Sequence, residues 1–349
     1  MGLRTSSISV KTSLTSCTFK HVQNHCQTQK IVPLNRLNIT NFRLRQHTHS
    51  QENTFYSKQI CSFVFFPKGF GYHLAKRLDD NGFIVYAGVL KPNGDGACAL
   101  KSRKSKNLKV LKLDVTSDDD VKDAVAFVHK NKTGLWGIVN NAGFNIYGDV
   151  EICFIDHYKQ VLDCDLYGQI RIIKSFLPLI RKSKGRIVNI SSVMGLYACP
   201  GDSIYHTAKA GVEAFTQCLR YEMIKFGVRV SVVEPGWYDK ATSCSSPEQL
   251  QRIRSNLNEM WQAVTDEVRV SYGKDYVDKL YNIIADSGTG DAATSPEPVL
   301  AAIEDALINV NSQYRYLVGG SSRWIDPAAM LARIHNVLPD CIMYPVMII

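Results

Sequence analysis

Between about residues 62 and 318, short apolar runs alternate with segments whose apolar residues recur at helical spacing. Each run is bounded by glycine, proline or polar residues, which is typical of buried strands. Strands that alternate with helices predict a parallel sheet with helices on both faces, a doubly wound α/β fold. The predicted strands are Ser62–Phe66, Gly82–Leu90, Asn107–Leu113, Leu135–Val139, Arg186–Ile190, Val228–Val233 and Tyr314–Val318.

The segments between the strands carry apolar residues at helical spacing. Leu74 and Leu78 share one face of a helix after the first strand, and Ser117 with three aspartates predicts the start of another. Two longer helices are predicted at about Asp156–Arg181 and Ser203–Phe226, and a further helix begins after Ser295. Residues 237–290 are helical and polar and interrupt the alternation of strands and helices, so we interpret them as an insert that covers the substrate. The insert belongs to a single domain at residues 61–325.

Glycines and small polar residues gather where the predicted strands end. In a parallel sheet these carboxyl ends lie at one edge, where ligands bind. A strand, a glycine turn and a helix also place backbone N–H groups against a pyrophosphate. The residues at these ends are Gly69, Gly71, Asp114, Asn140, Asn141, Ala142, Gly143, Ser191, Ser192, Pro235 and Gly236.

Three side chains suggest acid/base chemistry at that edge. Tyr205 and Lys209 are four residues apart, one turn on a helix. An ammonium beside a phenol lowers the phenol's pKa, so that Tyr205 could exchange a proton with an alcohol or a ketone. Ser192 arrives from the preceding strand and could hold the substrate oxygen. Taken singly, each residue also fits an ordinary surface role.

Charge is concentrated at the amino terminus. Residues 1–60 hold eight Lys/Arg and one acid, so they account for most of the formal net charge of +9. This basic leader, rich in Ser and Thr, has the composition of a mitochondrial transit peptide or of a disordered tail. The remainder is nearly balanced, which argues against nucleic-acid binding. The ten cysteines show no metal-ligand spacing, so no metal site is predicted.

Together these motifs resemble the short-chain dehydrogenase/reductase family over about residues 62–320. The resemblance is strongest to its hydroxybutyrate dehydrogenase branch, beside the retinol and 17β-hydroxysteroid dehydrogenases. It implies a Rossmann-type fold and hydride transfer between an alcohol or ketone substrate and a nicotinamide cofactor. Tyr205 would be the acid/base, Lys209 its tuner and ribose ligand, and Ser192 the oxygen anchor. The passages that carry the resemblance are Asn140–Gly143, Leu113–Thr116, Ser192, Tyr205, Lys209 and Pro235–Gly236.

The resemblance also assigns the cofactor contacts. Asp114 and Val115 would lie near the adenine, while Pro235 and Gly236 would border the nicotinamide. Asn140, Ala142 and Gly143 would follow the cofactor, as would Gly69 and Gly71 of the glycine loop. The branch favours NAD, although the second strand lacks the acid expected for the adenine ribose and is followed by Lys91, so NADP stays open.

Three positions depart from the family pattern. Aligning Gly69 and Gly71 puts Phe65 where a glycine is expected, and Pro67 removes an N–H from a phosphate loop. Either cofactor binding is weakened or the residues before about Lys68 derive from a mistaken exon, which we favour. Asp165 stands where the family has an asparagine in its proton relay, and its charge should raise the pKa of Tyr205. Asp202 precedes Tyr205 and disfavours an acidic substrate.

Two alternatives to a hydroxybutyrate-type enzyme therefore stay open. One is a steroid or retinol dehydrogenase, and the other is a catalytically impaired binding protein that keeps the fold. The family implies a homo-oligomer formed through the two long helices, a mitochondrial matrix or inner-membrane location, and peripheral membrane association. The endoplasmic reticulum membrane and the cytoplasm are the alternative locations. The apolar tail 326–349 fits core packing or a lipid-facing segment.

Overall fold

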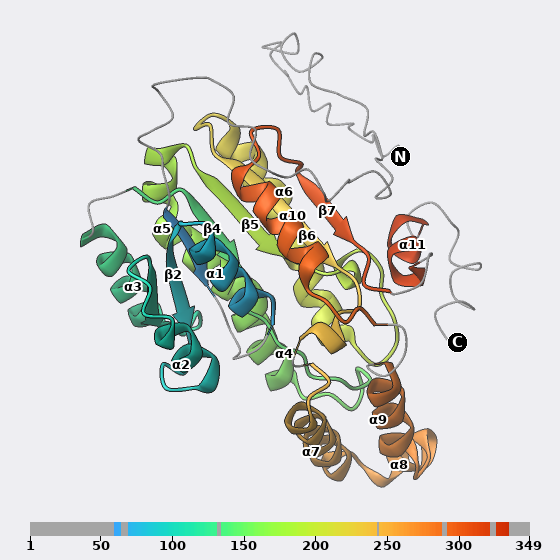
Figure 1. The fold of residues 1–349 in the computed structure, drawn as a ribbon. Coiled ribbons are helices and arrows are strands. Elements are labelled where there is room, and N and C mark those ends of the chain that lie inside the picture. Colours follow the sequence, from blue (N-terminus) through green and yellow to red (C-terminus); the bar gives the residue numbers. More distant parts are fainter. Residues whose placement is uncertain are drawn as a thin grey trace, which may run out of the picture. The chain divides into compact units, whose positions relative to one another are not determined.

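A seven-stranded parallel sheet forms the centre of the computed structural model (Figure 1). The structure describes residues 59–63, 69–130, 134–242, 244–287, 292–321 and 326–334. The strand order is β3-β2-β1-β4-β5-β6-β7, and every neighbouring pair is parallel. The strands are β1 (Gln59–Phe63), β2 (Ile84–Val89), β3 (Leu108–Lys112), β4 (Gly137–Asn140), β5 (Arg186–Ile190), β6 (Arg229–Pro235) and β7 (Arg315–Val318).

The strand order reverses between β1 and β4. From β1 the chain moves outward to β2 and β3, then returns to β4 and continues to β7. Such a switch point opens a crevice at the carboxyl ends of the two central strands, where nucleotides bind in doubly wound sheets. The predicted α/β class and doubly wound topology are therefore confirmed.

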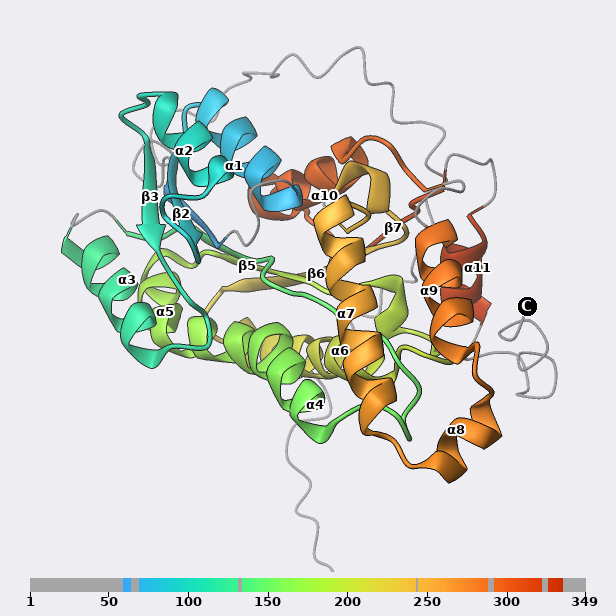
Figure 2. The ribbon, with the colours of Figure 1, turned by 90° about the horizontal axis from the view of Figure 1, so that it is seen from below.

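Helices cover both faces of the sheet, as Figure 2 shows. On one face, Leu74 and Leu78 of α1 pack in one apolar cluster with Ile303 of α10. On the other face, Phe176 of α5 and Leu219 of α6 share a second cluster, together with residues of α3. The helices concerned are α1 (Phe70–Asp80), α2 (Asp95–Ser102), α3 (Asp118–Lys130), α4 (Ile155–Leu162), α5 (Gln169–Ser183), α6 (Ser203–Ile224) and α10 (Glu297–Ile308).

Three elements differ from the prediction. The first strand lies at Gln59–Phe63, earlier than the expected Ser62–Phe66, and Phe65 and Pro67 lie outside the described residues. The helix expected at Asp156–Arg181 is α4 and α5 joined by a π-helical turn, Asp163–Gly168. Helix α2 was not predicted, because its short sequence carries little helical periodicity.

A separate group of helices lies beyond the carboxyl ends of the strands (Figure 1). Ser246 and Thr265 cap the first two of them, each accepting a backbone N–H bond three residues on. Their apolar faces form a cluster of their own, in which Leu257 and Met260 pack with Ile152 of the loop before α4. These helices are α7 (Pro247–Ala263), α8 (Asp266–Tyr272) and α9 (Tyr276–Ser287).

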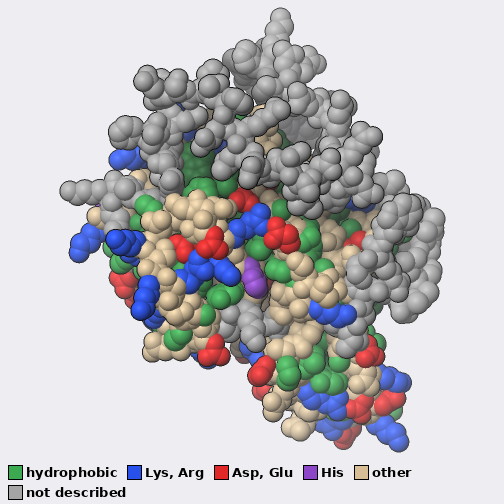
Figure 3. Space-filling model, viewed as in Figure 1, with side chains coloured by type: hydrophobic (Ala, Val, Ile, Leu, Met, Phe, Trp, Pro, Cys, Tyr) green, Lys and Arg blue, Asp and Glu red, His purple; other side chains and the backbone are tan. Residues whose placement is uncertain are grey.

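The surface mixes acidic and basic side chains, which lie next to one another in Figure 3. An example is Arg77 of α1, which pairs with Glu304 of α10 at 2.5 Å and joins the two helices on that face. Among the residues that the structure describes, no helix is both long and apolar enough to cross a membrane. The carboxyl-terminal helix α11 covers Pro327–Ile334, and the rest of the apolar tail lies outside the described residues.

Candidate active site

Helix α6 and the end of β5 bring Tyr205, Lys209 and Ser192 together. The Lys209 Nζ lies 5.1 Å from the centre of the Tyr205 ring, as the spacing of one turn requires. Ser192 follows β5 directly, and its hydroxyl hydrogen-bonds with Tyr205. The same hydroxyl accepts the Met194 N–H at 3.2 Å and donates to the Pro235 carbonyl at 3.4 Å. Ser192 is thereby fixed from both sides.

Asp165 enters this group from the π-helical turn. Its Oδ2 lies 3.1 Å from the Lys209 Nζ, and both side chains are buried. Its Oδ1 accepts the backbone N–H of Phe144 at 2.9 Å. A π-helical turn widens a helix by one residue, and such turns are frequent at functional sites. Here the turn places the fully buried Asp165 against Lys209, the lysine that faces Tyr205.

Gly143 is required by this arrangement. A Cβ at Gly143 would lie 2.6 Å from the Asp165 Oδ2 and 3.2 Å from the Lys209 Nζ. Only a residue without a side chain therefore lets the turn after β4 pass the ion pair. This gives a physical reason for the last glycine of the Asn-Asn-Ala-Gly motif.

The pKa of Tyr205 is raised well above its ordinary value. The sequence predicts that Lys209 lowers this pKa and that Asp165 raises it, and the structure agrees with the second prediction. Burial is the main cause, and the negative charge of Asp165 adds to it, followed by Cys244 and Asp202. The Ser192 hydrogen bond acts in the opposite direction. Because Asp165 pairs with Lys209, it offsets the charge that should favour the phenolate. Burial also raises the pKa of Asp165, while Lys209 lowers it.

A second polar chain lies behind the site. The Asn140 Nδ2 donates to the Asn189 Oδ1 at 2.8 Å, and the Asn189 Nδ2 donates to the Thr216 Oγ1 at 2.9 Å. All three residues are buried and come from β4, β5 and α6. The sequence analysis missed Asn189 and Thr216. The signal was an asparagine inside an otherwise apolar strand.

The amino terminus of α1 leaves room for a pyrophosphate. Gly69 has φ of +135°, and among the described residues a Cβ there would meet nothing within 4 Å. It precedes the amino terminus of an eleven-residue helix, where backbone N–H groups suit an anion. Gly71 is buried in the first turn. The residues present thus fit the phosphates of a dinucleotide.

The other predicted cofactor residues occupy the same edge of the sheet. Asp114 follows β3, and its Oδ1 accepts the Thr116 N–H at 2.9 Å and the Thr116 hydroxyl at 2.7 Å. Val115 is buried, and a Cβ on Gly168 of the π-helical turn would lie 2.5 Å from its Cγ2. Asp114 therefore orders the turn that follows β3.

Three more predicted residues complete this edge. Ala142 is 2% exposed beside Gly143, and Pro235 ends β6. A Cβ on Gly236 would lie 2.7 Å from the Gly320 backbone nitrogen, so Gly236 must be small. These residues therefore stand at the carboxyl ends of β4 and β6.

On the other side of Tyr205 the lining is acidic. The buried Asp202 accepts a hydrogen bond from the Asn145 Nδ2 at 2.8 Å. Burial raises the pKa of Asp239. Burial also raises the pKa of Tyr147, and the charges of Asp202 and Asp239 add to that rise. Lys240, the basic residue next to Asp239, is exposed.

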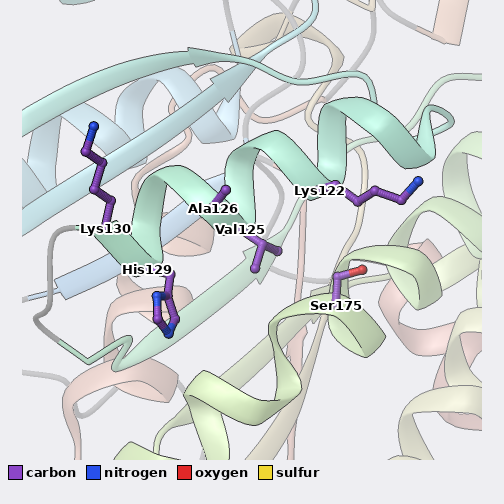
Figure 4. Close-up of a pocket in the computed structure, with 6 residues that line it drawn as sticks. All are labelled: Lys122, Val125, Ala126, His129, Lys130 and Ser175. Carbon is purple, nitrogen blue, oxygen red and sulfur yellow. The ribbon is translucent and has the colours of Figure 1, made fainter.

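A hollow of about 510 Å³ lies elsewhere, between α3 and α5 (Figure 4). Its lining includes Lys122, His129 and Ser175, and it contains none of the predicted site residues. Across the described part of the chain, no group of three or more His, Cys, Asp or Glu is arranged to hold a metal ion.

Comparison with known proteins identifies relatives over most of this chain. Residues 67–251 match the family model described as short chain dehydrogenase. The chain is 44% identical to the mitochondrial D-beta-hydroxybutyrate dehydrogenase of Rattus norvegicus over 255 residues, which cover 71% of this chain and 73% of that protein. It is 35% identical to 17-beta-hydroxysteroid dehydrogenase type 6 of Bos taurus, over 77% of this chain and 86% of that protein.

A solved structure gives the same picture of the fold. The short chain dehydrogenase from Burkholderia cenocepacia J2315, in complex with NADP, superposes with a TM-score of 0.58. It is 19% identical and covers 84% of this chain and 98% of its own. At this identity the likeness concerns the fold alone.

Proposed function

The chain belongs to the short-chain dehydrogenase family, and from that premise we propose that it oxidises a 3-hydroxybutyrate-type alcohol to its ketone with NAD. Membership makes it an oxidoreductase that acts on CH–OH groups with a nicotinamide cofactor. The observation that carries the assignment of roles is the meeting of Tyr205, Lys209 and Ser192 at the carboxyl edge of the sheet.

In this proposal the chain's own groups bind the substrate and move its proton. The Ser192 hydroxyl holds the substrate oxygen, and the Tyr205 oxygen takes the alcohol proton during oxidation or returns it during reduction. Lys209 stabilises the phenolate, and Asp165 fixes Lys209 while weakening that effect. The bound cofactor supplies the hydride acceptor or donor.

In this proposal NAD binds in the crevice at the carboxyl edge of the sheet. The free amino terminus of α1 at Gly69 suits the pyrophosphate, and Asp114 and Val115 stand after β3, on the adenine side. Asn140, Ala142 and Gly143 would follow the dinucleotide toward Pro235 and Gly236, with Gly71 beneath the phosphates. NAD is favoured by the 43–44% identical hydroxybutyrate relatives, while Lys91 after β2 favours NADP.

A second candidate substrate is an uncharged alcohol of the steroid type. The acidic residues Asp202 and Asp239 near Tyr205 and Tyr147 disfavour a carboxylate, and a 17-beta-hydroxysteroid dehydrogenase is 35% identical. Both candidates use the same proton transfer. The two candidates differ in whether the residues around Tyr205 must accept a charged or an uncharged substrate.

For the assembly, we propose a homo-oligomer formed through α4–α5 and α6 of each copy. Tyr167, Tyr221 and Ile224 are large, exposed side chains on these segments, more than half of each being accessible. The mitochondrial names of the hydroxybutyrate relatives support a mitochondrial location, and the leader at 1–60 has a suitable composition. Peripheral association with the membrane there is proposed on the family resemblance.

The test is a substrate and cofactor matrix on the purified chain. Oxidation of D-3-hydroxybutyrate, of a neutral secondary alcohol of the same length, and of a 17β-hydroxysteroid is measured with NAD and with NADP. The proposal expects the highest kcat/KM with D-3-hydroxybutyrate and NAD. Preference for the steroid would select the second candidate. The absence of NADH and NADPH binding, with no turnover of any alcohol, would select a binding protein that only keeps the fold.

A further inference from the structure

Asp202 stands at the position that caps α6, but its side chain does not cap the helix. An aspartate in this place ordinarily accepts an N–H from the first turn. Here no such bond forms, and the Oδ1 accepts the Asn145 Nδ2 at 2.8 Å instead. The residue is 4% exposed, and within the described part of the chain its Oδ2 has no hydrogen-bond partner. A buried carboxyl that leaves its own helix uncapped requires another explanation.

Backbone contacts show which two segments meet at Asp202. Gly148 and Asp202 form an isolated parallel bridge, and the Gly148 N–H donates to the Gly201 carbonyl at 2.8 Å. The loop from Phe144 to Gly148 is thus attached to the start of α6. At its other end, the Phe144 N–H donates to Asp165. One loop therefore connects Asp165 with Asp202, and the charges of both acids raise the pKa of Tyr205 in addition to its burial.

The groups facing Asp202 leave its charge uncompensated. Its pKa is raised by burial to about 8, and the Asn145 hydrogen bond is the influence that opposes this rise. Cys199 and Cys153 are half-buried, and desolvation raises their pKa values to about 11 and about 12, so they are neutral where Asp202 titrates. The other titratable groups that interact with it are Tyr147, Tyr197 and Tyr205.

We propose that Asp202 is a positioning residue for Tyr205, which joins the loop 144–148 to α6 and, once ionised, restrains loss of the Tyr205 proton. The proposal rests on the proposed role of Tyr205 as the acid/base. Asp202 lies one helical turn before Tyr205, and its negative charge opposes a phenolate.

A directional effect follows. Oxidation needs the phenolate of Tyr205, whereas reduction needs the phenol. As the pH rises through about 8, the two ionisations compete, so the rate of oxidation rises with pH less steeply than for one independent group. Reduction keeps its proton donor to higher pH. The ionised acid thus flattens the rise of the oxidation rate with pH in alkaline conditions.

The experiment compares Asp202→Asn with wild type in both reaction directions between pH 6 and pH 10. The carboxamide keeps the shape and can keep the Asn145 bond, but it does not ionise. We expect equal kcat/KM for oxidation at pH 6 and a value about tenfold higher for the variant at pH 9, where wild-type Asp202 is charged. Asp156→Asn, an acid with 71% of its side chain exposed on α4, is the matched control and should follow wild type throughout.

Asn145→Ala separates the two parts of the proposal. It removes the side-chain connection but leaves the acid, so kcat should fall about tenfold already at pH 6. Coinciding oxidation profiles of Asp202→Asn and wild type would overturn the proposal. If Asp202→Asn does not fold, the wild-type profile alone decides, because a rise with the slope of a single ionisation contradicts the competition.

Failure of the proposed function gives a different result. In that case no alcohol is turned over by any variant. The tyrosinate absorbance of wild type minus Tyr205→Phe still reports the Tyr205 ionisation without turnover. In the Asp202→Asn background this difference signal should appear at lower pH than in wild type. An unshifted signal would reject the positioning role independently of catalysis.

Discussion

Replacing Asp165 with asparagine perturbs the ion pair at the centre of the site. The Asp165 Oδ2 lies 3.1 Å from the Lys209 Nζ, and that nitrogen lies 5.1 Å from the centre of the Tyr205 ring. Asparagine removes the negative charge and retains an oxygen that can accept the Phe144 N–H. Lys209 then acts on Tyr205 without an offsetting charge, so the phenolate becomes easier to form.

The two distances give the size of the effect. They place the Asp165 oxygen at most about 8 Å from the Tyr205 ring. At an effective dielectric constant of about 20, two unit charges at that separation interact by about 2 kcal/mol, a factor of about 30 in the phenolate population. Loss of the buried partner of Lys209 should also destabilise the fold, by about 3 kcal/mol.

The assay is the pH profile of kcat/KM for alcohol oxidation, together with urea unfolding. Asp165→Asn should move the rising limb to lower pH and increase the rate up to about 30-fold where wild-type Tyr205 is still protonated. Asp163→Asn is the control, because Asp163 lies in the same π-helical turn but pairs with Arg171 at the surface. If the Asp165→Asn profile superimposes on that of wild type, Asp165 does not influence Tyr205 and the reasoning is wrong.

Two further substitutions test close packing. Gly143→Ala should lower kcat at least about tenfold, because its Cβ would lie 2.6 Å from the Asp165 Oδ2 and 3.2 Å from the Lys209 Nζ. Gly134→Ala, whose Cβ would have only an ordinary contact at 3.9 Å, should retain activity, and equal losses in both variants would contradict the assignment. Phe176→Ala should reduce the free energy of unfolding by about 3–5 kcal/mol in urea titrations, since Phe176 is fully buried in the core. A loss below about 1 kcal/mol would contradict that packing.

Strand and helix alternation was sufficient to predict the sheet, because buried parallel strands are apolar throughout and need little context. Strand β5 was predicted at its observed bounds, Arg186–Ile190. Strand β1 was predicted three residues too late. The predicted range Ser62–Phe66 and the observed range Gln59–Phe63 overlap and are both partly apolar, so the apolar pattern alone does not distinguish them. Only pairing with β2 and β4 distinguishes them. The π-helical turn was missed because no local pattern marks it, and the close approach of Val115 to Gly168 within it is a contact between distant segments.

The site was predictable where spacing along one helix defines it. Tyr205 and Lys209 needed only the four-residue interval, whereas their electrostatic balance depends on groups from other elements. The raised pKa of Tyr205 follows mainly from its burial, which only the fold creates, and then from Asp165, whose effect the family pattern predicts. The connection between Asn145 and Asp202 likewise crosses 57 residues of sequence, and no local pattern indicates it.

The most direct test of the account is Tyr205→Phe, assayed for NADH binding and for NAD-dependent alcohol oxidation on the same preparation. Removing only the phenolic oxygen leaves the ring beside Lys209 and the crevice at Gly69 unchanged. We predict that NADH binds within about twofold of wild type while kcat falls at least about 10²-fold. Retention of wild-type turnover by this variant would contradict the central claim that Tyr205 exchanges the substrate proton.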